Sequence, residues 1–230
     1  MSKIAVCKNK EFLWTPDLAY AIGLLTTDGS LSKDGRHISL VSADIELLKK
    51  FQKCLPFKTN ISKNAPGGYS VNSIYRVQFS NVAFYNWLLK IGLFPNKTFT
   101  IKELDIPDIF FKDYLRGHLD GDGDIVTYTD KYNVYKNKRY TYQRIYTRFR
   151  SASEKHMTWL CNKIKINLSA SSNIYKQIDK RNGHCTMWQI RFAKKDSINL
   201  LTKIYYSKNI PSLDRKRLKF EKFICSNTEN

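Results

Sequence analysis

The chain has 230 residues, of which 42% are hydrophobic, enough for one large domain or two of about 100 residues each. Lys and Arg total 39 against 20 Asp and Glu, a formal net charge of +19. This excess favours nucleic acid as the partner, because binding releases the counterions held at the phosphates. The sequence has no run of about 18 apolar residues and no apolar signal core near its start, so we expect an intracellular protein with no membrane partner.

The first predicted element is a helix that carries a short motif at residues 21–29. Thr15 is a good N-cap, Pro16 suits the first helical position, and Gly29 suits a left-handed C-cap. One face of this helix carries only small residues, spaced by four: Ala19, Gly23 and Thr27. Such a face predicts close contact with a second helix.

The remaining predicted elements follow in a simple order. In the first half we expect a hairpin turn at 33–35, a strand at 37–42, a helix at 44–55, strands at 60–63 and 71–79, and a helix at 81–91. We place the domain boundaries at 1–92 for the first half, 93–108 for a linker, and 109–230 for a second half with a basic C-terminal helix.

A repeat relates the two halves. The motif at 21–29 returns at 115–123, where Gly117 and Gly121 take the small positions. Residues 75–79 resemble 188–192 at an offset of 113. The repeat predicts an α+β fold with pseudo-twofold symmetry, packed through the two motif helices.

Each motif has an acid directly before its final glycine, Asp28 or Asp122. A carboxylate at a helix C-terminus is unfavourable, and two carboxylates side by side repel. Bound Mg²⁺ relieves both costs, with the backbone carbonyls of Thr27 and Gly121 as further ligands. Such metal ions activate water for attack on a phosphodiester. A third acid, Asp120, is expected to be structural or solvated.

A second expected feature is a polar strand surface suited to the major groove. Residues 139–151 alternate between basic or aromatic side chains on one face and apolar side chains such as Ile145 and Phe149 on the other. Arg, Gln and Asn can read base edges, and loop lysines suit phosphates, whereas an ordinary solvated sheet face is the alternative. The expected DNA contacts are Lys33, Arg36, His37, Ser39, Val41, Asn72, Arg76, Gln78, Tyr140, Tyr142, Arg144, Tyr146, Arg148, Arg150, Lys176, Gln189 and Arg191.

The two motifs, the segment Pro95-Asn96-Lys97 and the tail Leu213-Asp214-Arg215-Lys216 resemble the LAGLIDADG homing endonucleases, in the form of a single chain with two motifs. The resemblance covers nearly the whole chain. It implies a monomer of two αββαββα halves, whose antiparallel sheets form a saddle over a long double-stranded DNA target. It also implies Mg²⁺-dependent double-strand cleavage across the minor groove with 3′ overhangs, using Asp28 and Asp122.

Some expectations follow from this resemblance. Mn²⁺ should substitute for Mg²⁺, and Ca²⁺ should bind without cleavage. The family often has Gln or Lys after the second strand to order the catalytic water, but this chain has Ser42-Ala43 and Ser151-Ala152 there. Lys97 and Lys216 are the candidate replacements.

The sequence allows more than one genetic origin and more than one function for the protein. The chain starts with Met1 and lacks a terminal His-Asn, so we expect an intron-encoded or free-standing enzyme rather than an intein. The alternative functions are an intron RNA maturase, with intron RNA as a partner, and a non-cleaving DNA-binding regulator.

Overall fold

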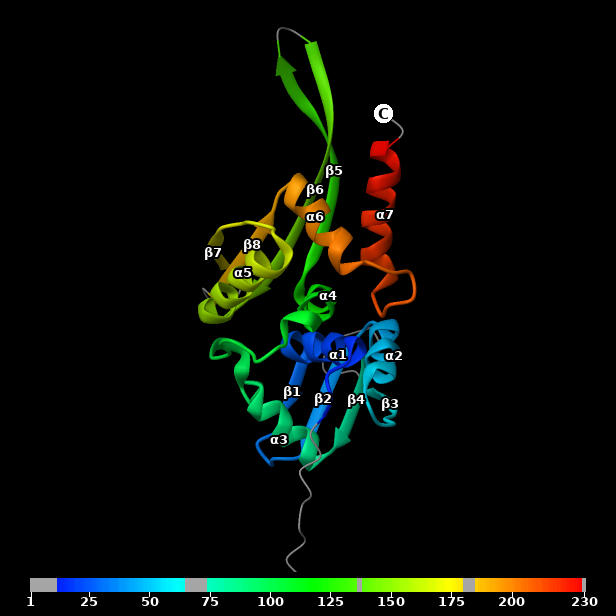
Figure 1. The fold of residues 1–230 in the computed structure, drawn as a ribbon, viewed down its shortest axis with the longest axis vertical. Helices are drawn as coiled ribbons and strands as arrows, with labels where there is room; N and C mark the ends of the chain where they lie inside the picture. Colours follow the sequence, from blue (N-terminus) through cyan, green and yellow to red (C-terminus); the bar gives the residue numbers. More distant parts are fainter. Residues whose placement is uncertain (1–11, 65–73, 136–137, 180–184, 229–230) are drawn as a thin grey trace, which may run out of the picture.

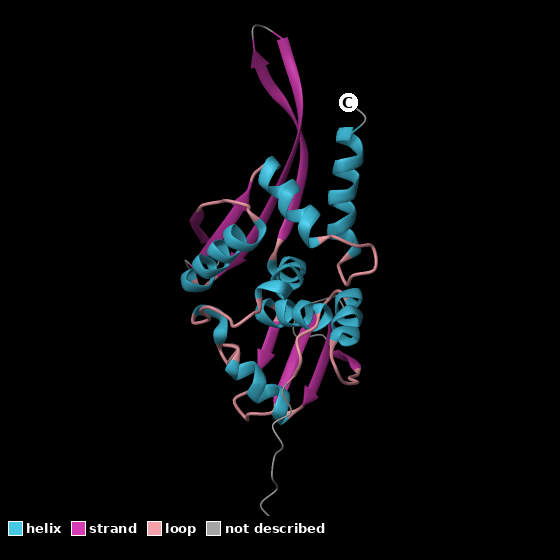
Figure 2. Cartoon of the chain, viewed as in Figure 1, coloured by secondary structure: helices cyan, strands magenta, loops and turns pink. Residues whose placement is uncertain are grey.

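The computed structural model describes residues 12–64, 74–135, 138–179 and 185–228. Figures 1 and 2 show two sheets on opposite sides of a central helix pair. The helices are α1 (Pro16–Thr27), α2 (Ile45–Cys54), α3 (Val82–Lys90), α4 (Phe111–Asp122), α5 (Glu154–Leu168), α6 (Lys194–Ile204) and α7 (Asp214–Thr228), with short 3-10 turns η1 (Lys97–Phe99) and η2 (Asp108–Phe110). The strands are β1 (Gly29–Leu31), β2 (His37–Ser42), β3 (Ile61–Asn64), β4 (Ile74–Ser80), β5 (Asp124–Tyr135), β6 (Lys138–Ser151), β7 (Ile174–Asp179) and β8 (Cys185–Phe192).

The two antiparallel sheets have the same strand order, β1-β2-β4-β3 and β5-β6-β8-β7. The predicted α+β class with two pseudo-symmetric halves is therefore confirmed. The main difference between the halves is the first hairpin. In the second half β5 and β6 have 12 and 14 residues, against 3 and 6 for β1 and β2, so this hairpin extends beyond the body of the molecule (Figure 1).

Local capping explains where the helices begin. The Thr15 hydroxyl accepts a hydrogen bond from the Leu18 amide at 3.1 Å, and the Asn81 side chain accepts one from the Phe84 amide at 3.0 Å. The predicted start of the motif helix at Pro16 is confirmed.

The expected role of Gly29 as a left-handed C-cap is wrong. Gly29 is the first residue of β1, and the described glycines with positive φ are Gly35 and Gly92. A Cβ at Gly29 would lie 2.6 Å from the Cα of Leu25, and one at Gly123 would lie 2.7 Å from the Cα of Leu119. These glycines are needed because each strand turns back against the last turn of its own helix.

Helices α1 and α4 cross with their backbones in contact. A Cβ at Gly117 would overlap the carbonyl oxygen of Tyr20 and lie 3.1 Å from the Cα of Gly23. A Cβ at Gly23 would likewise lie 2.6 Å from the amide nitrogen of His118. All nine residues of α1 from Leu18 to Thr26 are buried. The predicted contact through small residues is confirmed.

No helix in the described ranges is long and apolar enough to cross a membrane.

Candidate active site and nucleic-acid interface

The helix crossing brings the two motif acids to the same end of the helix pair. Asp28 caps the C-terminus of α1, and Asp122 is the last residue of α4. A Cβ at Gly121 would lie 2.8 Å from Oδ2 of Asp28 and would overlap the hydroxyl of Thr27. Glycine at position 121 therefore lets the Asp28 carboxylate lie against the last turn of α4.

The surroundings disfavour negative charge on both acids. Loss of hydration, and then repulsion from Asp122, raises the pKa of Asp28 from 3.8 to about 6. Loss of hydration also raises the pKa of Asp122. Lys97 and Lys216 offset part of this effect at both carboxyl groups.

These two lysines are buried at equivalent places in the halves, with exposed fractions of 7% and 5%. The Lys97 ammonium donates to the carbonyl of Gly29, just after the first motif acid. The Lys216 ammonium donates to the carbonyls of Leu119 at 2.6 Å and of Gly123 at 2.8 Å. Burial lowers the pKa of each lysine to about 8.

The donor set fits Mg²⁺. Within the described part of the chain, no three His, Cys, Asp or Glu side chains gather into a metal cluster. Mg²⁺ commonly binds through one or two carboxylates and takes its other ligands from water and substrate phosphates. Asp28 and Asp122 supply such a pair, and their raised pKa values show that a cation would relieve unfavourable charge there. The Gly121 carbonyl already accepts from Lys216 at 3.3 Å, which leaves it a second lone pair.

Asp120 is structural and buried, not solvated. Its Oδ2 accepts hydrogen bonds from the Tyr20 hydroxyl at 2.9 Å and the Leu213 amide at 2.7 Å. Asp120 thereby connects α4 to α1 and to the segment before α7. The third motif acid holds the two halves and the C-terminal helix together.

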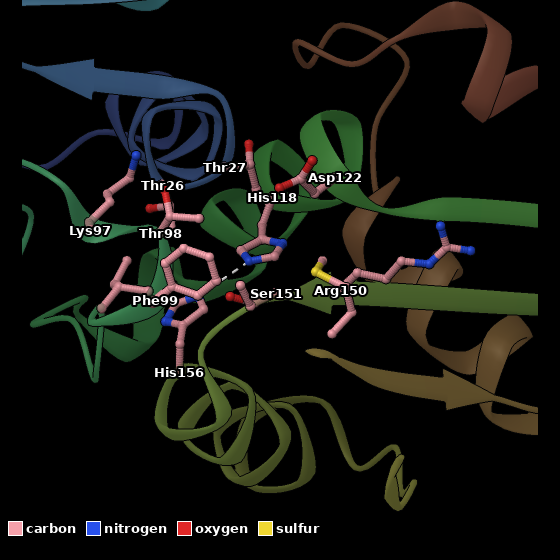
Figure 3. Close-up of a pocket in the computed structure, with 13 residues that line it drawn as sticks. Thr26, Thr27, Lys97, Thr98, Phe99, His118, Asp122, Arg150, Ser151 and His156 are labelled. Atoms are coloured by element: carbon pink, nitrogen blue, oxygen red, sulfur yellow. Dashed lines mark hydrogen bonds between the residues drawn. The ribbon is translucent and has the colours of Figure 1, made fainter. Parts of the chain in front are cut away.

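A cavity of about 160 Å³ lies beside Asp122, between the motif helices, the linker and β6 (Figure 3). Lys97 and Arg150 line it from the linker and the sheet, and His118 and His156 line it from α4 and α5. The sequence did not indicate the histidines as a set, because 38 residues separate them and their proximity depends on how α5 packs on α4.

The second-half sheet carries an ordered row of basic and aromatic side chains. Arg148 forms an ion pair with Asp124, and Arg144 forms one with Asp130 at 3.2 Å. The Tyr146 ring lies 4.9 Å from the Arg191 guanidinium and is stacked on the Tyr128 ring at 6.0 Å. Two aspartates of β5 thus hold arginines of β6 in place.

The first-half surface is less charged. Ser39 pairs across strands with Gln78, and Val41 with Arg76, whose guanidinium donates to Gln78 at 3.0 Å. His37 is hydrogen bonded to Asp34 in the β1–β2 turn. Lys33 and Arg36 are exposed in the same turn.

The structure brings most predicted contacts onto these two surfaces, with exceptions. Arg150 pairs with Gln189, and Arg148 pairs with Arg191, on one face. Lys176 instead pairs with Trp188, so it lies on the face of the sheet opposite Gln189 and Arg191, and Tyr175 occupies their face. The prediction at Asn72 and the side chain of Tyr140 lie outside the described residues.

The fold and the site together define a basic protein with paired carboxylates at a helix crossing, flanked by two antiparallel sheets. Residues 15–84 match the family model of the LAGLIDADG-like domain. The whole chain has the two-domain LAGLIDADG fold.

Solved structures with the same fold share little sequence with this chain. Variants of the homing endonuclease I-DmoI are 17% identical, with a TM-score of 0.56 over 90% of this chain and 97% of theirs. The I-LtrWI LAGLIDADG homing endonuclease bound to target DNA is 15% identical, with a TM-score of 0.59 over 92% of this chain and 89% of its own. Full-length DUF199/WhiA from Thermatoga maritima is 12% identical, with a TM-score of 0.54. The match covers 95% of this chain but only 63% of WhiA. No curated protein matches the chain by sequence.

Proposed function

We propose that the protein is a site-specific DNA endonuclease that makes a Mg²⁺-dependent double-strand break with 3′ overhangs. The observation that carries the proposal is the convergence of Asp28 and Asp122 at one end of the α1–α4 crossing, between two sheets with basic surfaces. The solved relatives bound to DNA targets support duplex DNA as the partner. A single chain carries both acids, so the proposed enzyme acts as a monomer.

In the proposed mechanism Asp28 and Asp122 would hold Mg²⁺ through carboxylate oxygens, with the carbonyls of Thr27 and Gly121 as further donors. The bound metal would activate water and stabilise the leaving oxygen. Lys97 and Lys216 place positive charge beside the scissile phosphates. Because their pKa values are near 8, each can exchange a proton close to neutral pH.

The proposed DNA contacts divide by chemistry. Arginine and glutamine side chains on the sheets read base edges in the major groove, and exposed lysines of the turns contact phosphates. Arg148 and Arg144 are held by acids of β5, so they meet DNA in a fixed orientation. Such preorganisation lowers the entropy cost of recognition.

A cleavage selection tests the proposal. The protein with Mg²⁺ is incubated with a large randomised duplex library, and the cut ends are sequenced. We expect a long motif with staggered ends, and no cutting by Asp28→Ala or Asp122→Ala. Binding of the recovered site in Ca²⁺ should be nearly unchanged in both variants. Loss of binding in Ca²⁺ equal to the loss of cutting would contradict the assignment of these acids.

A non-cleaving DNA-binding regulator is the second candidate, because the same fold occurs in a protein described as DUF199/WhiA rather than as an endonuclease. Sequence-specific binding without cutting in the same selection would favour it. Binding to intron RNA in place of duplex DNA would instead indicate a maturase.

A further inference from the structure

Two buried histidines lie against the candidate active site in the second half only. His118 of α4 and His156 of α5 are each 1% exposed. Their rings are stacked with centroids 5.4 Å apart, and their Nε2 atoms are 3.2 Å apart (Figure 3). One hydrogen bond therefore joins the two rings.

The hydrogen-bond partners determine where the protons are. His156 Nδ1 is 2.7 Å from the carbonyl oxygen of Lys102, which only accepts, so Nδ1 carries the hydrogen. Burial lowers the pKa of His156 to about 4 and lowers that of His118 well below its usual range, so both rings are neutral. His156 Nε2 must then accept a hydrogen bond from His118 Nε2.

This arrangement leaves His118 Nδ1 as a bare acceptor. In the described part of the chain, no other residue forms a hydrogen bond with it. A buried acceptor without a partner is unfavourable, because it has lost its hydrogen bonds to water. The atom is therefore positioned for a ligand rather than for packing.

His118 faces the catalytic side of the cavity. It lies four residues before Asp122 on α4, so both side chains project from the same face of the helix. The ring nitrogen that does not contact His156 is turned toward the side where Asp122 lies (Figure 3). The cavity of about 160 Å³ has space for several waters.

The first half provides an internal comparison. The repeat of the motif aligns His118 with Leu24. His156 is the third residue after Ser153, the N-cap of α5, and Leu47 is the third residue after Asp44, the N-cap of α2, so these two positions correspond. Leu24 and Leu47 are buried and apolar. The fold thus accepts a leucine pair at this position and does not require histidines.

We propose that His118 Nδ1 accepts a hydrogen bond from the water that attacks the phosphodiester on the Asp122 side. His156 and the Lys102 carbonyl are positioning groups that hold the His118 tautomer. This role, which rests on the proposed endonuclease function, would supply the water contact that Ser151-Ala152 lack. The water oxygen bonds to phosphorus, the bond to the leaving sugar oxygen breaks, the water's proton passes to solvent, and the leaving oxygen takes a proton from solvent.

The inference predicts unequal treatment of the two DNA strands. The acids are related by the pseudo-twofold axis, as are the two strands of a duplex, so each scissile phosphate has one acid as its nearer neighbour. Only the phosphate near Asp122 has a histidine pair beside it. Removing the pair should slow the cut in one strand and leave the other unchanged.

The experiment uses the full chain and its selected duplex, with a different fluorophore on each strand. His118→Leu, which copies the first half, should slow one strand cut by about tenfold or more, so that nicked duplex accumulates. His118→Asn keeps an acceptor near the Nδ1 position and should restore most of the rate. His118→Gln keeps only the link to His156 and should not. Ca²⁺-dependent binding should stay close to wild type in all three, which shows that each variant is folded.

The inference would be overturned if His118→Leu slowed cleavage of both strands equally, or if His118→Asn cut no faster than His118→Gln. Either result would still be consistent with the proposed endonuclease function. His156→Leu gives a second test, because it should also slow the same strand through loss of the tautomer. A wild-type protein that cuts neither strand overturns the proposed function itself.

Discussion

At the scale of single residues, two glycines decide how closely the halves approach. Gly23 and Gly117 face each other where α1 crosses α4, and a side chain on either would meet backbone atoms of the partner helix. These backbone atoms cannot rotate away from an added Cβ, whereas a flexible side chain could. The helices would have to separate, and the geometry of Asp28 and Asp122 at their ends would change with them.

We expect Gly117→Ala to lower the free energy of unfolding by about 3 kcal/mol, because it overpacks this crossing. Chemical denaturation measures the change. Gly35→Ala is the comparison, since its Cβ meets nothing within 4 Å and only its positive φ is strained. That variant should lose about 1 kcal/mol. Equal losses in the two variants would contradict the steric explanation.

A second residue-scale prediction concerns the pKa of Asp28. Its folded value of about 6 lies above the usual 3.8, so between these values the folded state holds the proton more tightly than the unfolded chain. Stability therefore falls as pH rises through this window and stays lower above it. We expect Asp28→Asn without divalent metal to raise the melting temperature at pH 7.5 by about 2–4 °C, after allowing for solvent screening.

Differential scanning fluorimetry checks this prediction. The gain should be smaller at pH 5, where Asp28 is mostly protonated in the folded protein. Mg²⁺ should raise the melting temperature of the wild type more than that of the variant. A gain independent of pH would show that the charge on Asp28 is not its cause.

At the scale of elements, the β5–β6 hairpin makes the polar surfaces of the two sheets unequal. Its arginines are held by Asp124 and Asp130, whereas the shorter β1–β2 hairpin presents Ser39 and Val41. Helix α7 runs beside β5, and its Lys219 donates to the Ile125 carbonyl at 3.3 Å. The long hairpin is therefore supported along its base as well as internally paired.

Arg148→Ala should relax sequence preference at one base pair, at a cost of about 1–3 kcal/mol in specific binding. A binding-based selection on randomised duplexes measures the preference. Lys33→Ala is the control, because an exposed phosphate contact should weaken all sequences alike and reduce the salt slope by about 1. An unchanged base profile for Arg148→Ala would rule out direct readout by this side chain.

At the scale of the whole molecule, contacts between the halves go beyond the motif helices. Lys50 of α2 forms an ion pair with Asp214 at the start of α7 at 2.8 Å, and Arg215 forms one with Asp44 at 3.3 Å. Both pairs connect the first half to the C-terminal helix. Because α1 and α4 pack directly against each other, separating the halves would expose residues of both helices.

We therefore expect a single calorimetric unfolding transition whose calorimetric and van't Hoff enthalpies agree. The measurement is differential scanning calorimetry of the full chain. Two resolved transitions would show that the halves unfold independently. Asp120→Ala should reduce the melting temperature without splitting the transition, because Asp120 links α4 to Tyr20 and Leu213.

The sequence by itself determined what depends on near neighbours in the chain. Thr15 and Pro16 predict a helix start because capping acts within one turn, and the structure has the helix begin at Pro16. Alternation places Ile145 and Phe149 in the core because strand side chains point to opposite faces in turn. The repeated motif predicted two halves of similar structure, because similar sequence patterns form similar elements. This symmetry in turn predicted that Asp28 and Asp122 would lie close together.

Tertiary structure decided what depends on contacts between distant residues. Lys216 binds the last carbonyls of α4, which are 93 to 97 residues away in the sequence. His118 contacts His156, which is 38 residues away. The pairing of β7 with β8 puts Lys176 on the face opposite the proposed DNA contacts Gln189 and Arg191, because a shift of one residue exchanges the two faces of a strand. Glycine is needed at position 29 because a Cβ there would overlap the backbone of Leu25, not because the residue has a left-handed conformation. This contact arises because the strand after α1 folds back onto the helix. Local rules act over a few residues, whereas packing, burial and charge at the site depend on the path of the whole chain.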